Sequence, residues 1–325
     1  MLPEPIPGNS NTIKYRTLGR TGLRVSQIGL GGGGKSCLGR KKGKPESESV
    51  RLVERAIELG INLIDTSGRN LTESIIGRGI HSYDRDGLVL STKRTVSEGT
   101  VLNTASQFAD SLEDSLRALD TPYIDIMHFH GVLPDEYDYV VAELLPVMEK
   151  FRAEGKIRHI GLTEIFERDR NHVMLRRALA DNYWDVMMVG FNMINQSARD
   201  LVFAAASEKN IGILGMFAVR RALTSSEAFT QTLRNLQSAG MLPTDLDVGS
   251  VLARLTDQGA HRRTLAEIAY LYCRDEPAIQ SVLMGTGEIS HLEENVQTFG
   301  EPPLADDTRR FIAETFGHIS DFSGN

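Results

Sequence analysis

Eight short apolar segments recur along this chain of 325 residues, and a stretch with helical periodicity follows each of them. The segments lie at residues 27–30, 63–65, 88–93, 124–130, 157–162, 186–190, 212–216 and 279–284. Continuous apolar runs are typical of parallel strands that helices cover on both faces. Between the runs, apolar residues recur every three or four positions, as at Phe108, Leu112 and Leu116, which gives a helix one apolar face. Eight such units can close on themselves, so the pattern predicts a (β/α)8 TIM barrel.

Two further segments complete the predicted architecture. Residues 14–18 and 23–25 are β-prone and are joined by a glycine-bounded turn, which predicts an N-terminal β-hairpin. Residues 218–264, between the seventh strand and its helix, are too long for an ordinary connection and predict a functional loop with helical pieces. Because barrels of this length usually have one core, we expect residues 1–325 to form a single domain, with residues 1–12 as a flexible tail.

The composition argues against membrane and nucleic-acid partners. The apolar runs are far shorter than the ~20 residues that cross a bilayer, and residues 1–11 lack an apolar secretion signal, so we expect a cytoplasmic protein. Two cysteines, Cys37 and Cys273, are too few for a disulfide framework. The net charge of -7 argues against a nucleic-acid groove. One loop is nevertheless basic, which predicts a solvated segment; it contains Lys35, Arg40, Lys41, Lys42 and Lys44.

The glycine run at residues 29–34 formally matches the dinucleotide-binding pattern G-x-G-x-x-G. That fingerprint must open directly into a helix. Here Gly39, Gly43 and Pro45 interrupt the following residues, which is unfavourable for a helix. The run therefore predicts the first strand-to-helix loop at a barrel mouth rather than a Rossmann domain.

Three ionisable residues stand at the carboxyl ends of consecutive predicted strands, where barrel enzymes build their active sites. Asp65 ends the second strand, Lys93 the third and His130 the fourth. Burying an acid and a lysine near each other is costly unless they pair, so the three predict a catalytic cluster. His128 and His130 share a strand face, a spacing used by metal sites, but the other ligands of such a site are missing and we expect no metal.

The segment GINLIDTSGRNLTESIIG at residues 60–77 resembles the aldo-keto reductase signature, G-I-N-x-x-D-T-A-x-x-Y-G-x-E-x-x-x-G. Further motifs follow in the family's order: YRTLGRTGLRVSQIGL at 15–30, STK at 91–93, SLRALDTPYID at 115–125, GKIRHIGLT at 155–163 and LEEN at 292–295. The resemblance extends from residue 15 to about residue 316. It implies an NAD(P)H-dependent oxidoreductase that acts on a small carbonyl or alcohol substrate.

The resemblance also implies a catalytic tetrad of Asp, Tyr, Lys and His. Asp65, Lys93 and His130 match three members, and Asn70 stands at the tyrosine position. Asparagine cannot release a proton. Losing a general acid typically costs ~10²–10⁴ in rate, so we expect weak reduction. His130, of a residue type with a pKa of ~6.5, is the expected replacement acid.

Tyr137 and Tyr139, in the loop after the fourth strand, are further predicted donors that would fold over the mouth. The family's cofactor contacts, carried over by position, predict a dinucleotide site. Its residues are Thr163, Glu164 and Met188 at the nicotinamide carboxamide, Met216 and Phe217 at the ring, Arg220 and Arg221 at the pyrophosphate, and Gly285, Gly287, His291, Glu294 and Asn295 at the adenosine end. Gly287 replaces the usual contact to the 2′-phosphate, so the expectation of NADP(H) rather than NAD(H) is the family default.

Two alternative functions fit the departures from the family pattern. Glu164 adds a carboxylate at a strand end, which with Lys93 or His130 would suit a non-redox lyase, dehydratase or isomerase. A cofactor-binding protein with little turnover is the other alternative. The substrate and the oligomeric state do not follow from the sequence.

Overall fold

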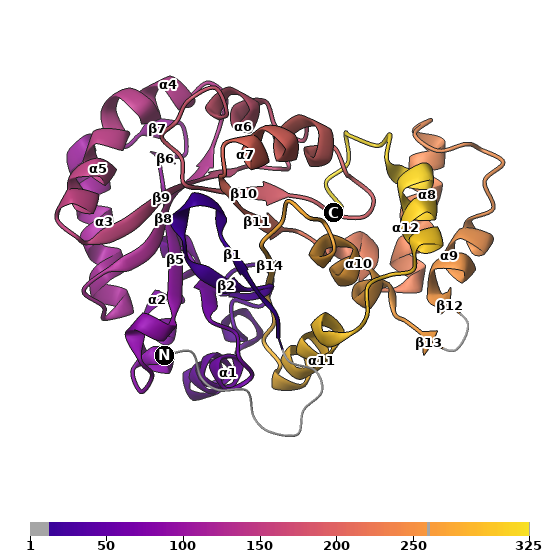
Figure 1. The fold of residues 1–325 in the computed structure, drawn as a ribbon, viewed down its shortest axis with the longest axis horizontal. Helices are drawn as coiled ribbons and strands as arrows, with labels where there is room; N and C mark the ends of the chain where they lie inside the picture. Colours follow the sequence, from indigo (N-terminus) through magenta and orange to yellow (C-terminus); the bar gives the residue numbers. More distant parts are fainter. Residues whose placement is uncertain (1–12, 259–260, 325) are drawn as a thin grey trace.

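Eight parallel strands close into a barrel in the computed structural model, which describes residues 13–258 and 261–324 (Figure 1). Around the barrel the strands follow the order β10-β11-β14-β3-β4-β5-β8-β9. Their bounds are β3 (Ile28–Gly31), β4 (Leu63–Asp65), β5 (Val89–Thr95), β8 (Ile124–Val132), β9 (Ile157–Glu164), β10 (Val186–Gly190), β11 (Gly212–Met216) and β14 (Ser281–Met284). The predicted (β/α)8 barrel is confirmed. The tail predicted at residues 1–12 lies outside the described residues.

Helices cover the outer face of the barrel. They include α1 (Glu46–Glu58), α2 (Glu73–Ile80), α3 (Ala105–Leu119), α4 (Tyr137–Tyr139), α5 (Leu145–Ala153), α6 (Val173–Ala178), α7 (Ala204–Glu208), α10 (Leu265–Arg274) and α11 (Ile289–Gly300). Helix α3 begins with a capping box between Thr104 and Gln107, which satisfies two backbone N–H groups. Its apolar side is buried against the sheet, as the spacing predicts. None of the helices within the described residues is long and apolar enough to cross a membrane.

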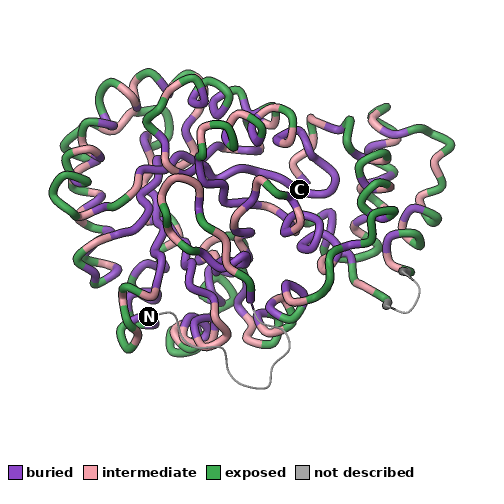
Figure 2. Tube along the Cα trace, in the orientation of Figure 1, coloured by how far each residue is buried: buried purple, intermediate pink, exposed green. Residues whose placement is uncertain are grey.

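Two apolar layers result. The larger lies between the helices and the outside of the barrel, and a smaller one fills the barrel interior. Figure 2 shows the strands and the inner faces of the helices as buried, with exposed residues on the outer turns.

The predicted hairpin, β1 (Tyr15–Thr17) and β2 (Arg24–Ser26), closes the amino-terminal end of the barrel. Its Leu18 joins the interior apolar cluster. Gly19 packs so tightly that a Cβ would lie 2.3 Å from the backbone nitrogen of Gly212, the first residue of β11. Arg20 donates to the carbonyl of Trp184, at 2.5 Å, just before β10. The carboxyl ends of the strands therefore form the other end, which we call the mouth.

Residues 218–264 contain the predicted helical pieces, α8 (Ser226–Ser238) and α9 (Val248–Thr256). With α12 (Asp306–Phe316) they form a group beside the barrel (Figure 1). Phe229 of α8 contacts Phe316 of α12 with ring centroids 6.3 Å apart.

Three strands extend two residues further towards the mouth than predicted. Strand β5 continues to Thr95, β8 to Val132 and β9 to Glu164. Pairing explains the extension, because Thr95 is in register with His130, and Val132 with Glu164. The first loop contains only a 3-10 turn at Arg40–Lys42 before α1, so the glycine run does not open into a helix, as predicted.

Candidate active site

Asp65 and Lys93 form a buried ion pair at the mouth. The Lys93 Nζ atom lies 2.7 Å from both carboxylate oxygens of Asp65 and 2.7 Å from the carbonyl oxygen of Thr66. The two side chains are each only 8% exposed. A buried pair is tolerable because each charge is met by its partner and by further hydrogen bonds. The predicted pairing is therefore present, and it directs all three ammonium protons towards acceptors.

A chain of hydrogen bonds holds Asp65 from inside the barrel. Ser91 donates its hydroxyl proton to Asp65 Oδ1 at 2.7 Å, so His128 Nε2, 3.1 Å from Ser91 Oγ, must be the donor in the next bond. Burial lowers the pKa of His128 well below its usual range, which keeps the ring neutral. A Cβ on Gly161 would lie 2.1 Å from Nδ1, so glycine makes room for the ring. The His128 ring thus takes part in this series of hydrogen bonds and also packs in the core.

His130 stands nearer the mouth on the same strand. Burial, then the positive charges of Lys93 and Arg69, lower the pKa of His130 to about 3. At neutral pH the ring is therefore uncharged. It can donate one hydrogen bond but has no imidazolium proton to give, so its expected role as replacement acid is corrected.

Asn70 lies on a 3-10 turn (Gly68–Asn70) after β4 and faces the first loop. A Cβ on Gly33 would lie 2.7 Å from Asn70 Nδ2, so the amide packs against the glycine run. The asparagine occupies the tyrosine position in sequence and offers an amide only.

Tyr137 and Tyr139 are not placed as donors at the mouth. The chain after β8 turns into α4, and the Tyr137 hydroxyl bonds to Asp181 at 2.5 Å beside Trp184. Tyr139 donates to the carbonyl of Asn103 at 2.9 Å. Both hydroxyls serve loop packing, so the prediction that they act as lid donors is wrong.

Glu164 ends β9 and is buried, and both of its carboxylate oxygens form hydrogen bonds within the protein. Its Oε2 lies 2.8 Å from Nδ1 of His172, and its Oε1 accepts from the backbone of Gly190 at 2.8 Å. His172 Nε2 in turn lies 3.0 Å from Ser197 Oγ. Burial raises the pKa of Glu164. With both oxygens engaged and the residue 4% exposed, the carboxylate is not presented to a substrate as the expected alternative base would be.

The series of hydrogen bonds that begins at Glu164 continues to the carboxyl-terminal segment. Ser197 Oγ lies 2.7 Å from Asn195 Oδ1. The Asn195 amide nitrogen donates to the carbonyls of Ser320 and Phe322 at 2.8 and 2.9 Å. The carboxyl-terminal segment is therefore fastened to the loop after β10. Sequence reasoning missed His172 and Ser197, because neither lies at a strand end.

Aromatic rings line the mouth beside β11. Phe166 stacks on His172 and on Phe217, with centroids 5.5 and 6.1 Å apart. The guanidinium of Arg220 lies 3.5 Å from the centroid of Phe217 and pairs with Glu167 at 2.5 Å. Met216 and Phe217 are apolar, as the expected ring contact requires, but Met216 is buried in the interior cluster and Arg220 covers one face of Phe217. Arg220 could meet a pyrophosphate, as expected, only if its ion pair with Glu167 opened. Arg221 is exposed.

The residues expected at the adenosine end lie in the loop after β14 and on α11. Gly287 packs against the first loop, because a Cβ on Gly287 would lie only 2.7 Å from Gly39 Cα. Glu294 and His291 are exposed and Asn295 is half-buried, and within the described residues none of their side chains forms a hydrogen bond. These groups are open to a ligand. Gly285 and Thr163 lie at the mouth, where Thr163 Oγ1 accepts from the Gly131 backbone at 2.7 Å and keeps its own proton to donate. Met188, on β10, is in the interior cluster and offers no polar contact.

Strain and unpaired polar atoms gather at the same end. Several residues with side chains adopt positive φ in the loops after barrel strands: Cys37, Leu38, Leu71, His172 and Phe217. Buried polar atoms in the same loops or at a strand end have no partner among the described residues: Ser67 Oγ, His130 Nδ1, Arg170 Nε and Asn192 Nδ2. Both features concentrate at functional sites.

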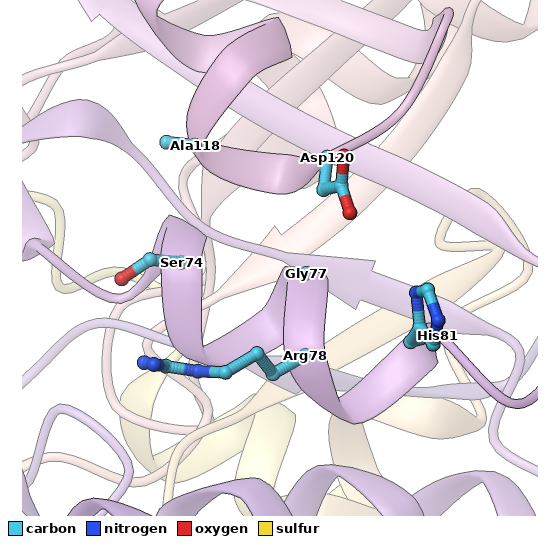
Figure 3. Close-up of a pocket in the computed structure, with 6 residues that line it drawn as sticks. All are labelled: Ser74, Gly77, Arg78, His81, Ala118 and Asp120. Carbon is cyan, nitrogen blue, oxygen red and sulfur yellow. The ribbon is translucent and has the colours of Figure 1, made fainter.

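A separate surface pocket lies in the helical layer. Figure 3 shows its lining, which comes from α2 and the end of α3: Ser74, Gly77, Arg78, His81, Ala118 and Asp120. These residues do not belong to the loops after the barrel strands, so the pocket is distinct from the Asp65–Lys93 site.

Comparisons with known proteins agree with this geometry. The model of the Aldo/keto reductase family matches residues 27–314. L-galactose dehydrogenase of Arabidopsis thaliana is 28% identical over 299 residues, 89% of each chain. The uncharacterized oxidoreductase YqkF of Bacillus subtilis is 26% identical, over 88% of this chain and 90% of its own. The holo form of aldo-keto reductase AKR11C1 from Bacillus halodurans superposes with a TM-score of 0.70 and 25% identity, over 93% of this chain and 96% of that one.

Proposed function

Because this chain belongs to the aldo/keto reductase family, we propose that it is an NAD(P)H-dependent oxidoreductase that reduces a carbonyl at the mouth, or oxidises the corresponding alcohol. The observation that carries the proposal is the buried ion pair, in which Lys93 Nζ lies 2.7 Å from both oxygens of Asp65. A buried ammonium beside a neutral histidine is suited to stabilise negative charge that develops on a carbonyl oxygen. The dehydrogenase and oxidoreductase relatives support the same reaction type.

The roles follow from the charges. The nicotinamide cofactor supplies the hydride when it is bound. His130, neutral at pH 7, orients the carbonyl oxygen through its N–H group. Lys93 then provides the positive charge and the proton, with one of its N–H groups moving from an Asp65 oxygen to the substrate oxygen. Because the three N–H groups of Lys93 are already held by Asp65 and Thr66, one of these bonds must break first, so reduction is slower than with a tyrosine acid.

The residues present fit a dinucleotide best at the adenosine end. Glu294 and Asn295 would hold the adenine, and the Thr163 hydroxyl would contact the nicotinamide carboxamide. We propose NADP(H) over NAD(H), because two lysines of the first loop lie beside the start of α11, where the 2′-phosphate would bind. Lys42 and Lys44 lie 3.7 and 2.6 Å from Glu288 there. The Lys42 side chain is 53% exposed, so its charge remains available to a phosphate.

The non-redox alternative is not favoured. It depends on Glu164 as a base, and this carboxylate already accepts hydrogen bonds at both oxygens. The oxidoreductase relatives point the same way.

Fluorescence titration with NADPH and NADH, followed by a panel of aldehydes, tests the proposed function. We expect saturable binding and slow, aldehyde-dependent consumption of the reduced cofactor. Lys93→Met, which removes the ammonium, should abolish the consumption. Cofactor binding without any consumption by the wild type would contradict the reductase assignment, and conversion of an aldehyde without consumption would support the non-redox alternative instead.

A further inference from the structure

Arg69 is an exposed arginine beside the catalytic cluster, and its side chain forms no ion pair or hydrogen bond within residues 13–258 and 261–324. Several other cations at the strand ends or in the loops that follow them are already paired: Lys93 with Asp65, Arg94 with Glu73, Arg170 with Asp321 and Arg220 with Glu167. A guanidinium carries a fork of N–H donors that matches a carboxylate or phosphate. In Arg69 that fork is available.

The backbone at Arg69 is firmly supported. Arg94 donates to Ser115 Oγ at 2.7 Å and to Glu73 Oε2 at 3.0 Å, which fixes its guanidinium under the turn. A Cβ on Gly68 would lie 2.2 Å from Arg94 Nη1, so the turn rests directly on that group. Arg69 is therefore presented from a rigid base, which lowers the entropy lost when it binds a ligand.

The turn that carries Arg69 leans towards the strand of the catalytic histidine. Gly68 of this turn packs on Arg94 of β5, and β5 lies between β4 and β8 in the barrel. His130 is on β8, two strands from β4 in one direction around the barrel. The segments proposed for the cofactor phosphates follow β11 and β14, in the other direction. The turn of Arg69 therefore lies on the substrate side of β4, and the lowering of the pKa of His130 by the Arg69 charge agrees with that position.

We infer that Arg69 binds an anionic group of the substrate, so that the preferred substrates are carbonyl compounds that also carry a carboxylate or similar acid. The inference rests on the proposed function. The reacting oxygen belongs near Lys93 and His130, which are far less exposed than Arg69. A second, more solvent-exposed negative group on the same molecule would then meet the guanidinium, and the local field would draw anionic substrates to the mouth.

Two matched pairs of aldehydes test this. One is 4-carboxybenzaldehyde with its methyl ester, and the other is 4-oxobutanoate with its methyl ester. A hydrogen bond to a charged group contributes ~1.5–3 kcal/mol, so Arg69→Ala should lower kcat/KM for the acids by about 10- to 100-fold. The esters should change by less than about twofold, the range of an ordinary surface substitution. Arg69→Lys should retain part of the acid preference and Arg69→Glu should reverse it.

Arg117→Ala is the matched control, because Arg117 is an exposed arginine on α3 that pairs with Asp114. It should leave both acids and esters unchanged. Calorimetric titration of 4-carboxybenzaldehyde into protein saturated with NADP⁺ measures the Arg69 contact without turnover, and Arg69→Ala should weaken that binding.

An equal loss for acids and esters in Arg69→Ala would overturn the inference, and so would unchanged calorimetric binding. If the wild type consumes NADPH with neither acid nor ester while binding of the acid still depends on Arg69, the proposed reaction fails and the anion site stands. If the esters are reduced as well as the acids and Arg69→Ala changes nothing, the reaction stands and the anion site fails.

Discussion

Nδ1 of His172 lies 2.8 Å from the carboxylate of Glu164, and both side chains are completely shielded from solvent. The pair sits at the end of β9, where the family resemblance leads one to expect a contact to the nicotinamide carboxamide. Here the carboxylate instead ties the loop after β9 to the last residue of β10, Gly190. The mouth is therefore partly held together by the hydrogen bonds of Glu164 and His172.

Substitution of Glu164 by Gln should change how stability depends on pH. Burial raises the pKa of Glu164, so the folded protein binds this proton more tightly than the unfolded chain. Its contribution to stability is present below the unfolded carboxyl pKa of ~4.3 and is lost as pH rises through the folded value. The unfolding free energy of the wild type relative to Glu164→Gln should thus fall as pH rises from about 4.3 through the raised folded pKa. Urea unfolding across this range measures it, and a constant difference would contradict the assignment.

Removal of the His128 side chain should impair catalysis through Asp65. His128→Phe breaks the donation to Ser91, and the net loss of one such hydrogen bond is ~0.5–1.5 kcal/mol, so kcat should fall by up to about tenfold. The KM for the aldehyde should stay the same, because His128 does not touch the substrate. His128→Gln, which keeps a donor, should recover part of the loss. A rise in KM with unchanged kcat, in a protein that remains folded, would show that His128 does not position Asp65.

The strands and the Asp65–Lys93–His130 cluster could be predicted because they depend on local pattern and topology. Apolar runs define the strands, and a parallel barrel brings the carboxyl ends of all strands to one face. Residues at those ends therefore converge, whatever path the intervening loops take. The Asp65–Lys93 pair follows from this rule alone.

The loop contacts could not be predicted from periodicity. Phe166, His172 and Ser197 meet because of the path of irregular segments, which no spacing rule describes. Tyr137 and Tyr139 illustrate the reverse error: the chain after β8 forms α4 at once, and their hydroxyls bond to Asp181 and Asn103. The lowered pKa of His130 could not be predicted either, since burial and two neighbouring cations are three-dimensional properties.

Replacement of Leu71 by Gly should stabilise the fold. Leu71 has a φ of 55°, and its side chain is 61% exposed, so it gains little burial in return for a left-handed backbone. That conformation costs roughly 1–2 kcal/mol for a residue with a Cβ, and the greater freedom of glycine in the unfolded chain offsets about 0.4–1 kcal/mol of the gain. We expect a net gain of about 0.5–1 kcal/mol in urea unfolding. Leu71→Ala keeps the Cβ and should give no gain; equal effects of both variants would rule out backbone strain as the cause.

Loss of the Glu294 and Asn295 side chains on α11 should weaken the binding of both dinucleotides, whereas loss of Lys42 should weaken the binding of NADPH alone. Glu294→Ala combined with Asn295→Ala removes the proposed adenine contacts, so the Kd for NADPH and for NADH should rise together by about tenfold or more. Lys42→Ala should raise the Kd for NADPH alone, because only NADP(H) carries the 2′-phosphate. Fluorescence titration measures all four constants. An unchanged Kd for both cofactors in the double variant would remove α11 from the site.

Restoration of a tyrosine at position 70 should increase reduction. A nearby ammonium lowers the pKa of a tyrosine hydroxyl, and Lys93 is fixed by Asp65 at 2.7 Å. If the ring of Asn70→Tyr turns from Gly33 towards Lys93, it regains a general acid, and kcat should rise by about one to three powers of ten. Asn70→Phe is the matched control, since it adds the ring without the hydroxyl and should give no increase. Steady-state rates with NADPH and a simple aldehyde, measured on protein shown to bind the cofactor, decide the result. An equal response to Tyr and Phe would mean that ring packing, rather than proton transfer, limits this site, and no response to either would place the rate-limiting step away from the proton.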